Sequence, residues 1–474
     1  MLNSTRHVKL IRQYRLVWRT TRTPRRCLLT LAIETSCDDT CVALLEYNKP
    51  AHLPTTHEYN DHQARLHHHV KVTAPNTGKG GIHPVEAANS HRANLADLVK
   101  GTFDVIRHRK LKLEFVTVTR GPGMHSNLSC GLDTAKGLAV ALNLPLMGVH
   151  HMQAHALTPR LLYALQTPID SKKALNALQH NDDGSDLINK PGKLDPEFPF
   201  LTLLVSGGHT MLLHSKSLTD HTTLANTMDI AIGDALDKCG RLILPSHLTA
   251  DMADTAYAKH LSAYAFPDNS TYASYPISRT RGAEIDKPLN EHGWRFQLPL
   301  GATRKLAFSY AGLASQVEKI MKSKPDISDA ARLALARTVM GTAFEHLGSR
   351  TIMALEALRD QAIPLPRQLV VSGGVAANDF LRYFLRQMLD LRGFGQVELV
   401  FPPIYHKAVN KNDASFAPCT DNAAMIAWAG MEMYLARWRS GLDITAVSKW
   451  SMDPNKDGGI LGVPGWYNSD TTLV

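Results

Sequence analysis

The sequence predicts an α/β protein in which two copies of one folding unit face each other across a cleft. Each half opens with an apolar strand, a tight polar loop and a second apolar strand, in residues 28–48 and again in 198–217. Each half continues with a strand, a Gly-rich turn and a helix, in residues 114–142 and 367–389. β-Branched runs indicate the strands, and apolar positions about 3.6 residues apart indicate the helices. A chain of 474 residues is long enough for two such lobes.

The polar loops of the two halves predict what the cleft binds. A Gly-rich turn between a strand and a helix brings backbone N–H groups and a helix N-terminus close to an anion. One such turn can be a mere tight turn. Two polar loops in each half, in the same order, make four in all and favour a nucleotide-binding site between the halves.

The N-terminus differs in charge from the rest of the chain. Residues 1–27 carry seven Arg, one Lys and no acidic residue, and the first acidic residue is Glu34. These cations account for all but one unit of the net charge of +9. An Arg-rich, acid-free segment with Ser, Thr and scattered apolar residues is typical of a mitochondrial transit peptide, so we expect the mature protein in the matrix. A disordered basic arm is the alternative.

Domain boundaries follow from the repeated pattern. We expect an N-terminal lobe at 28–197 with loop insertions, a C-terminal lobe at 198–440 and a tail at 441–474. The last helix of the second lobe is free to pack back on the first lobe. No apolar run approaches the length of a membrane span, so membrane insertion is not expected. Segments poor in apolar residues are expected to be surface loops: 58–81, 165–197 and 264–296.

A pair of histidines follows an apolar run that has the character of a strand. His151 and His155 stand four residues apart, which on a helix places both imidazoles on one face. Such a pair binds a metal or is simply a polar helix face, and the spacing does not identify a third ligand.

Seven blocks of sequence resemble one known family, the TsaD/Gcp family, which makes threonylcarbamoyladenosine in tRNA. They occur in order between residues 29 and about 430, so they cover nearly the whole mature chain. With the transit-like N-terminus, the chain is similar to the mitochondrial branch. The blocks are ETSCDDT (34–40), GPGM (121–124), HHMQAH (150–155), LVSGGHT (204–210), GDALDK (233–238), SGGVAAN (372–378) and CTDNAAMIA (419–427).

The resemblance implies a fold and a reaction. The fold is that of the actin/Hsp70/sugar-kinase superfamily, two RNase H-like lobes with nucleotide between them. The reaction moves threonylcarbamoyl from threonylcarbamoyl-AMP to N6 of adenosine 37 in tRNAs that read ANN codons, and it releases AMP. The implied partners are tRNA, a separate upstream synthase that supplies threonylcarbamoyl-AMP, and a second copy of the chain in a homodimer.

The resemblance also implies site residues. One divalent metal ion per subunit is held by His151, His155 and Asp421, a ligand set that suits Fe, Zn or Mn and leaves positions open for substrate. Separately from the resemblance, the duplication places Asp38 and Asp39 in the first hairpin loop facing the cleft, where one of them would orient the attacking amine or take its proton; an Asx-turn is the structural alternative. The substrate-binding residues it implies are Leu204, Val205, Ser206, Gly207, Gly208, Asp237 and Asn378. A plain hairpin turn at 204–208 and an exposed helix carboxylate at Asp237 are the structural alternatives.

Two rival functions share part of this pattern. A metal-dependent glycoprotein endopeptidase would need a glutamate general base after the first histidine, as in H-E-x-x-H, and Met152 stands there. An ATP-binding kinase or chaperone-like module would share the fold. Such proteins hold phosphates with Mg²⁺ and acidic residues, and two histidines do not suit that role.

Overall fold

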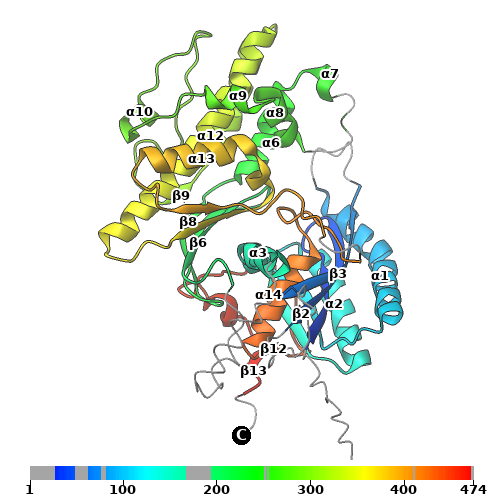
Figure 1. Cartoon of the computed structure of the whole chain (residues 1–474). Helices are drawn as coiled ribbons and strands as arrows, with labels where there is room; N and C mark the ends of the chain where they lie inside the picture. The colour runs from blue at the N-terminus through cyan, green and yellow to red at the C-terminus, as the bar shows by residue number, and fades with distance from the viewer. Residues whose placement is uncertain are drawn as a thin grey trace, which may run out of the picture.

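The computed structural model describes residues 27–48, 62–75, 82–166, 194–249, 252, 256–408 and 412–470. Two mixed β-sheets lie one beyond the other, with helices around and between them (Figure 1). The transit peptide predicted at 1–27 falls outside the described residues except for Cys27, which begins the first strand.

The first sheet combines strands from both ends of the chain. Its strands are β1 (Cys27–Glu34), β2 (Asp39–Asn48), β3 (Ala64–Thr73), β4 (Phe115–Gly121), β5 (Leu146–His150), β12 (Trp438–Ser440) and β13 (Trp466–Asn468). Their order is β13-β12-β5-β4-β1-β2-β3. β2 pairs antiparallel with β1 and β3, whereas β4 pairs parallel with β1 and β5.

The second sheet repeats this plan. Its strands are β6 (Phe200–Val205), β7 (Thr210–Ser215), β8 (His221–Thr227), β9 (Ala307–Phe308), β10 (Gln368–Ser372) and β11 (Glu398–Val400). Their order is β11-β10-β6-β7-β8-β9. β7 pairs antiparallel with β6 and β8, whereas β10 pairs parallel with β6 and β11.

The two sheets therefore contain the same five-stranded unit. The order β3-β2-β1-β4-β5 matches β8-β7-β6-β10-β11, with the same strand senses, which is the RNase H-like arrangement. The predicted α/β class and its duplicated unit are confirmed.

Helices form three layers around the two sheets. They are α1 (Pro84–Arg109), α2 (His125–Leu142), α3 (His151–Gln166), α6 (Ile232–Ile243), α7 (Ser246–Thr249), α8 (Tyr257–Ala265), α9 (Asn269–Ala273), α10 (Arg281–Ile285), α11 (Ala311–Ser323), α12 (Asp329–Asp360), α13 (Asp379–Leu391) and α14 (Ala423–Leu435), with 3₁₀ turns η1 (Gly374–Ala377) and η2 (Gly459–Gly462). α1 and α2 pack on the outer face of the first sheet. α3 and α14 lie between the sheets (Figure 1). α6, α8, α12 and α13 cover the far face of the second sheet.

The alternation of side chains along β6 explains how one strand serves two cores. Leu201, Leu203 and Val205 belong to the core beneath α6 and α12. Phe200 and Leu204 point to the opposite face and join the core around α3 and α14. The second sheet is thus buried on both faces, and the middle layer joins the two lobes.

The end of the chain returns to the first lobe. α14 contacts β1, β2, β4 and β5, and β12 and β13 follow it as added strands of the first sheet. Residues 441–470 are therefore built into the first lobe through η2 and β13.

Two segments expected to be loops contain regular structure. The expectation for 58–81 is wrong over Ala64–Thr73, because these residues form β3. The segment 264–296 contains α9 and α10 and buries Trp294 and Phe296. Of the expected loop 165–197, residues 167–193 lie outside the described residues. Among the described helices, none is long and apolar enough to cross a bilayer.

The contact of α14 with the first sheet depends on a glycine. A Cβ at Gly430 would lie 2.4 Å from Cγ2 of Thr117 on β4. We expect Gly430→Ala to lower the free energy of unfolding by about 1–3 kcal/mol, because the Thr117 side chain is fully buried and hydrogen-bonded to Thr30 and cannot move away freely. Gly137→Ala, in the interior of α2 with no atom within 4 Å of the added Cβ, should instead raise it by up to about 1 kcal/mol. Urea unfolding of both variants checks this, and equal effects would contradict it.

Candidate metal and nucleotide site

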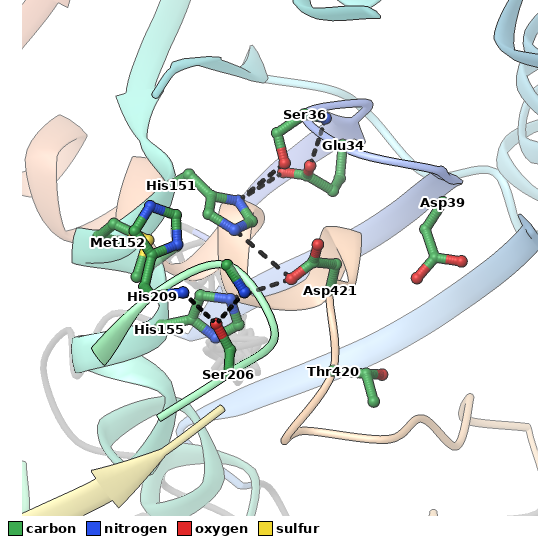
Figure 2. A network of polar contacts seen from close by, with 12 residues as sticks. Glu34, Ser36, Asp39, His151, Met152, His155, Ser206, His209, Thr420 and Asp421 are labelled. Atoms are coloured by element: carbon green, nitrogen blue, oxygen red, sulfur yellow. Dashed lines mark hydrogen bonds and ion pairs between the residues drawn. The ribbon is translucent and has the colours of Figure 1, made fainter. Parts of the chain in front are cut away.

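The three predicted metal ligands meet between the lobes. α3 begins directly after β5, so His151 is its first residue and His155 lies one turn further along. Asp421 stands next to Asn422, whose side chain caps α14 by accepting from the amide of Met425. Oδ1 of Asp421 lies 3.1 Å from Nε2 of His155 and 3.4 Å from Nε2 of His151 (Figure 2).

The spacing of these atoms fits a metal ion. Ligand atoms bound at about 2.1 Å to one cation lie roughly 3.0–3.4 Å apart in octahedral or tetrahedral geometry. The two distances from Asp421 fall in that range, and all three ligand atoms lie within 4.8 Å of one another. Both histidines are buried, while the Asp421 side chain is 25% exposed, which leaves one side of the group open to a ligand. Among the described residues, this is the one such cluster of three.

A fourth polar residue, Glu34, supports His151 from behind. Glu34 ends β1 and is fully buried. Its Oε2 lies 3.4 Å from Nδ1 of His151 and accepts a hydrogen bond from Thr119, while its Oε1 accepts from the amide of Ser36 at 2.6 Å. Histidine ligands usually donate their second ring N–H to such a carboxylate, which fixes the direction of the ligand nitrogen. Glu34 is not among the residues predicted from the sequence, although it opens the motif ETSCDDT.

His151 offsets part of the negative charge of the two carboxylates beside it. Burial lowers the pKa of His151, but Asp421 and Glu34 outweigh it and raise this pKa to about 10. Desolvation raises the pKa of Asp421, but His151 and the hydrogen bonds from both imidazoles hold it well below its usual range. Two carboxylates thus enclose a positive charge at a place where a divalent cation would also be stabilised.

The predicted substrate loop follows β6. Leu204 and Val205 are buried strand residues, so the accessible part begins at Ser206. Ser206 Oγ accepts hydrogen bonds from the amides of Gly208 and His209. A Cβ on Gly207 or Gly208 would meet no atom within 4 Å, so open space lies beside this loop.

Close backbone contacts fix this loop against two neighbouring segments. The first turn of α6 approaches so closely that a Cβ on Gly233 would lie 2.7 Å from the Ser206 carbonyl oxygen. Gly373 has a φ of +102°, and a Cβ there would lie 2.4 Å from the Val205 carbonyl oxygen. Glycine is required at both positions because a side chain would displace the loop.

The remaining predicted nucleotide contacts already have structural partners. Asp237 on α6 accepts a hydrogen bond from the amide of Ala258, in the first turn of α8. Asn378 caps α13 and donates to the hydroxyl of Ser262, also on α8. Both side chains therefore hold α8 in place beside α6 and α13.

The two predicted catalytic aspartates differ in their surroundings. Asp39 accepts hydrogen bonds from Lys71 and Thr73 of β3, and it lies apart from the ligand cluster (Figure 2). The Lys71 ammonium also donates to the backbone carbonyl of Asp421 at 3.4 Å. Asp38 lies beside Cys37, where burial and then the charges of Asp421 and Asp38 raise the thiol pKa.

Comparison with known proteins now identifies the group to which this site belongs. Residues 66–171 and 186–428 match the TsaD family, described as tRNA N6-adenosine threonylcarbamoyltransferase. The chain belongs to this family. It is 33% identical to the "tRNA N6-adenosine threonylcarbamoyltransferase, mitochondrial" of Schizosaccharomyces pombe, over 98% of this chain and 96% of that relative. It is 31% identical to the enzyme of the same name, without the word mitochondrial, from Sphingopyxis alaskensis, over 90% of this chain and 96% of the relative.

Membership of the TsaD family makes the chain a transferase that acts on tRNA, as the resemblance implied. The two lobes have the actin-like fold expected for the family. The family is also metal-dependent, which agrees with a cluster in which His151, His155 and Asp421 could hold an ion.

The contact between Glu34 and His151 makes a testable prediction. Glu34→Gln keeps the shape but removes the charge behind the imidazole, so zinc affinity should fall about 10- to 100-fold. Competition with a chromophoric chelator measures this affinity. Glu345→Gln is the matched control: Glu345 is also buried, but it pairs with Lys287 in the second lobe. Unchanged zinc affinity in Glu34→Gln would contradict a supporting role.

Proposed function

We propose that the chain transfers threonylcarbamoyl from threonylcarbamoyl-AMP to N6 of adenosine 37 in mitochondrial tRNAs that read ANN codons, with release of AMP. Family membership supports the reaction class, and the name of the Schizosaccharomyces pombe relative supports the compartment. The observation that carries the proposal is the convergence of two imidazoles and one carboxylate on open space beside a glycine loop.

His151, His155 and Asp421 are the proposed ligands of one divalent cation, with Fe, Zn and Mn suited to the mixed imidazole–carboxylate set. When bound, the cation supplies positive charge that stabilises the oxygens of the acyl phosphate group. Glu34 holds the His151 ring so that Nε2 faces Asp421.

The loop after β6 is the proposed seat of the adenylate. Its neighbour α6 directs its N-terminus toward the loop, where the helix dipole favours an anionic phosphate. Ser206 presents a hydroxyl, and Gly207 and Gly208 permit the ligand to approach the backbone. Asp237 and Asn378, which hold α8, are proposed to line the ribose side of the same space.

The two aspartates after β1 take different proposed roles. Because Asp39 accepts from Lys71 and Lys71 reaches the Asp421 carbonyl, Asp39 acts through its neighbour as a positioning residue. Asp38, which precedes Asp39 in the same loop, is the proposed group that orients the attacking amine or takes its proton.

Competing functions fit the site less well. Peptide hydrolysis by a metal-bound water needs a general base next to the first histidine, and buried Met152 occupies that position. Phosphoryl transfer would place Mg²⁺ among carboxylates and phosphates, whereas two of the three converging ligands here are imidazoles. An upstream synthase is the proposed source of threonylcarbamoyl-AMP, and a homodimer is the proposed assembly.

Transfer of labelled threonine tests the function. With bicarbonate, ATP, the upstream adenylate-forming enzyme and mitochondrial tRNA, this chain alone should place the label in tRNA. His151→Ala and Asp421→Ala should each lower the rate at least about 100-fold, because preorganised charge at the acyl phosphate is lost. His247→Ala, on exposed α7, is the control. Label in phosphorylated small molecules would favour a kinase, and cleavage of a glycoprotein would favour an endopeptidase.

The open space beside Gly207 makes a separate prediction. Gly207→Ala should fold like the wild type, because the added methyl meets no protein atom. It should weaken AMP binding about tenfold or more, because the methyl would occupy space reserved for the nucleotide. Calorimetric titration with AMP measures this. Gly312→Ala, equally unhindered on α11, should leave AMP affinity unchanged. Equal AMP affinity in all three proteins would exclude Gly207 from the nucleotide site.

A further inference from the structure

We propose that His150 is a positioning residue for the metal site, and that the C-terminal segment 447–460 fixes it in this role. His150 precedes the ligand His151 and is not itself directed at the cluster. The inference rests on the metal site proposed above, and it concerns how this chain keeps that site in shape.

His150 caps the helix that carries both histidine ligands. It is the last residue of β5 and is fully buried. Its Nδ1 accepts hydrogen bonds from the amides of Met152 at 3.1 Å and Gln153 at 3.4 Å. These are the second and third amides of α3, the two that an N-cap side chain normally satisfies. Ser, Thr, Asp and Asn are the usual caps, so the presence of a histidine at this N-cap position needs a separate explanation.

The other ring nitrogen supplies that explanation. Nε2 of His150 lies 3.0 Å from the backbone carbonyl oxygen of Trp450, to which it donates. A carbonyl can only accept and an amide can only donate, so His150 must carry its proton on Nε2 and leave Nδ1 free to accept. The Trp450 carbonyl therefore selects the tautomer that is able to cap α3. A shorter Asn or Ser side chain cannot join the two partners.

Trp450 is held firmly in turn. Its ring lies 4.6 Å from that of His150, and its Nε1–H donates to the carbonyl of Gly459. Three residues earlier, the amide of Val447 donates to the carbonyl of Arg120 at 2.9 Å. Three residues later, Asp453 accepts from the amide of Thr223 on β8 of the second lobe. The segment is thus anchored to both lobes on either side of its contact with His150.

The consequence concerns the direction of the ligands. His151 is the first residue of α3, so the first turn sets where its imidazole points. β5 ends at His150 and α3 begins at His151, with no linking residue between them. The hydrogen bond from His150 to Trp450 fixes the cap, and the cap holds the first turn of α3. Segment 447–460 therefore acts on the metal site without touching the metal ligands.

Zinc affinity of the full-length protein tests the proposal. His150→Ala should bind zinc at least about tenfold more weakly than the wild type, as expected when the support of a ligand is removed. His150→Asn restores a cap but not the contact with Trp450, so it should recover only part of the affinity. His346→Ala is the matched control: His346 is equally buried and also accepts from a backbone amide, that of Ser309, but in the second lobe. It should lower the thermal midpoint and leave zinc affinity unchanged.

Zinc affinity of His150→Ala within twofold of the wild type would overturn the proposal, as would an equal loss of affinity in His346→Ala. A wild-type chain that binds no zinc, iron or manganese would instead overturn the metal site itself. Nitrogen-15 NMR of the histidine rings in the metal-free wild-type protein gives a test that needs no variant to fold. We expect the Nε2–H tautomer for His150, and the Nδ1–H tautomer would overturn the proposal.

Discussion

The meeting of two helix N-termini between the sheets is the constraint on which the rest of the structure depends. α3 brings His151 and His155, and the residue before the cap of α14 brings Asp421, 266 positions beyond His155 in sequence. Taking these groups out of water is costly unless their charges are paired. The imidazolium of His151 between Asp421 and Glu34 supplies part of that pairing and holds the three side chains together.

The two copies of the duplicated unit use the same loop position for different purposes. In each copy, the hairpin loop between the first two strands faces the middle layer. In the first copy, the last strand residue Glu34 and the loop residue Ser36 lie beside Nδ1 of His151. In the second copy, the equivalent loop supplies Ser206 and two glycines beside open space. One topology thus provides the residues behind the proposed metal ligand in one copy and the proposed nucleotide-binding loop in the other.

Several residues that sequence motifs associate with substrate are also structural supports. Asp237 and Asn378 bind α8, and Asp39 binds Lys71, which reaches the carbonyl of Asp421. Each of these polar groups would be costly to bury alone, so the fold gives it a partner. Residues near the site therefore contribute by fixing its shape. Their hydrogen-bond partners in the protein show that they support neighbouring elements.

The sequence by itself determined the duplicated α/β unit, because strand alternation and helical spacing are local patterns that neighbouring residues carry. It also placed His151 and His155 on one helical face. It misassigned β3 as a loop, because the pairing partner that makes Ala64–Thr73 a strand lies elsewhere in the chain. Only the tertiary structure joined Asp421 to the histidines without recourse to family resemblance, placed Glu34 behind His151, and brought Trp450 to His150. Those contacts form between segments that are distant in sequence, and spacing along the chain does not predict which distant segments pack together.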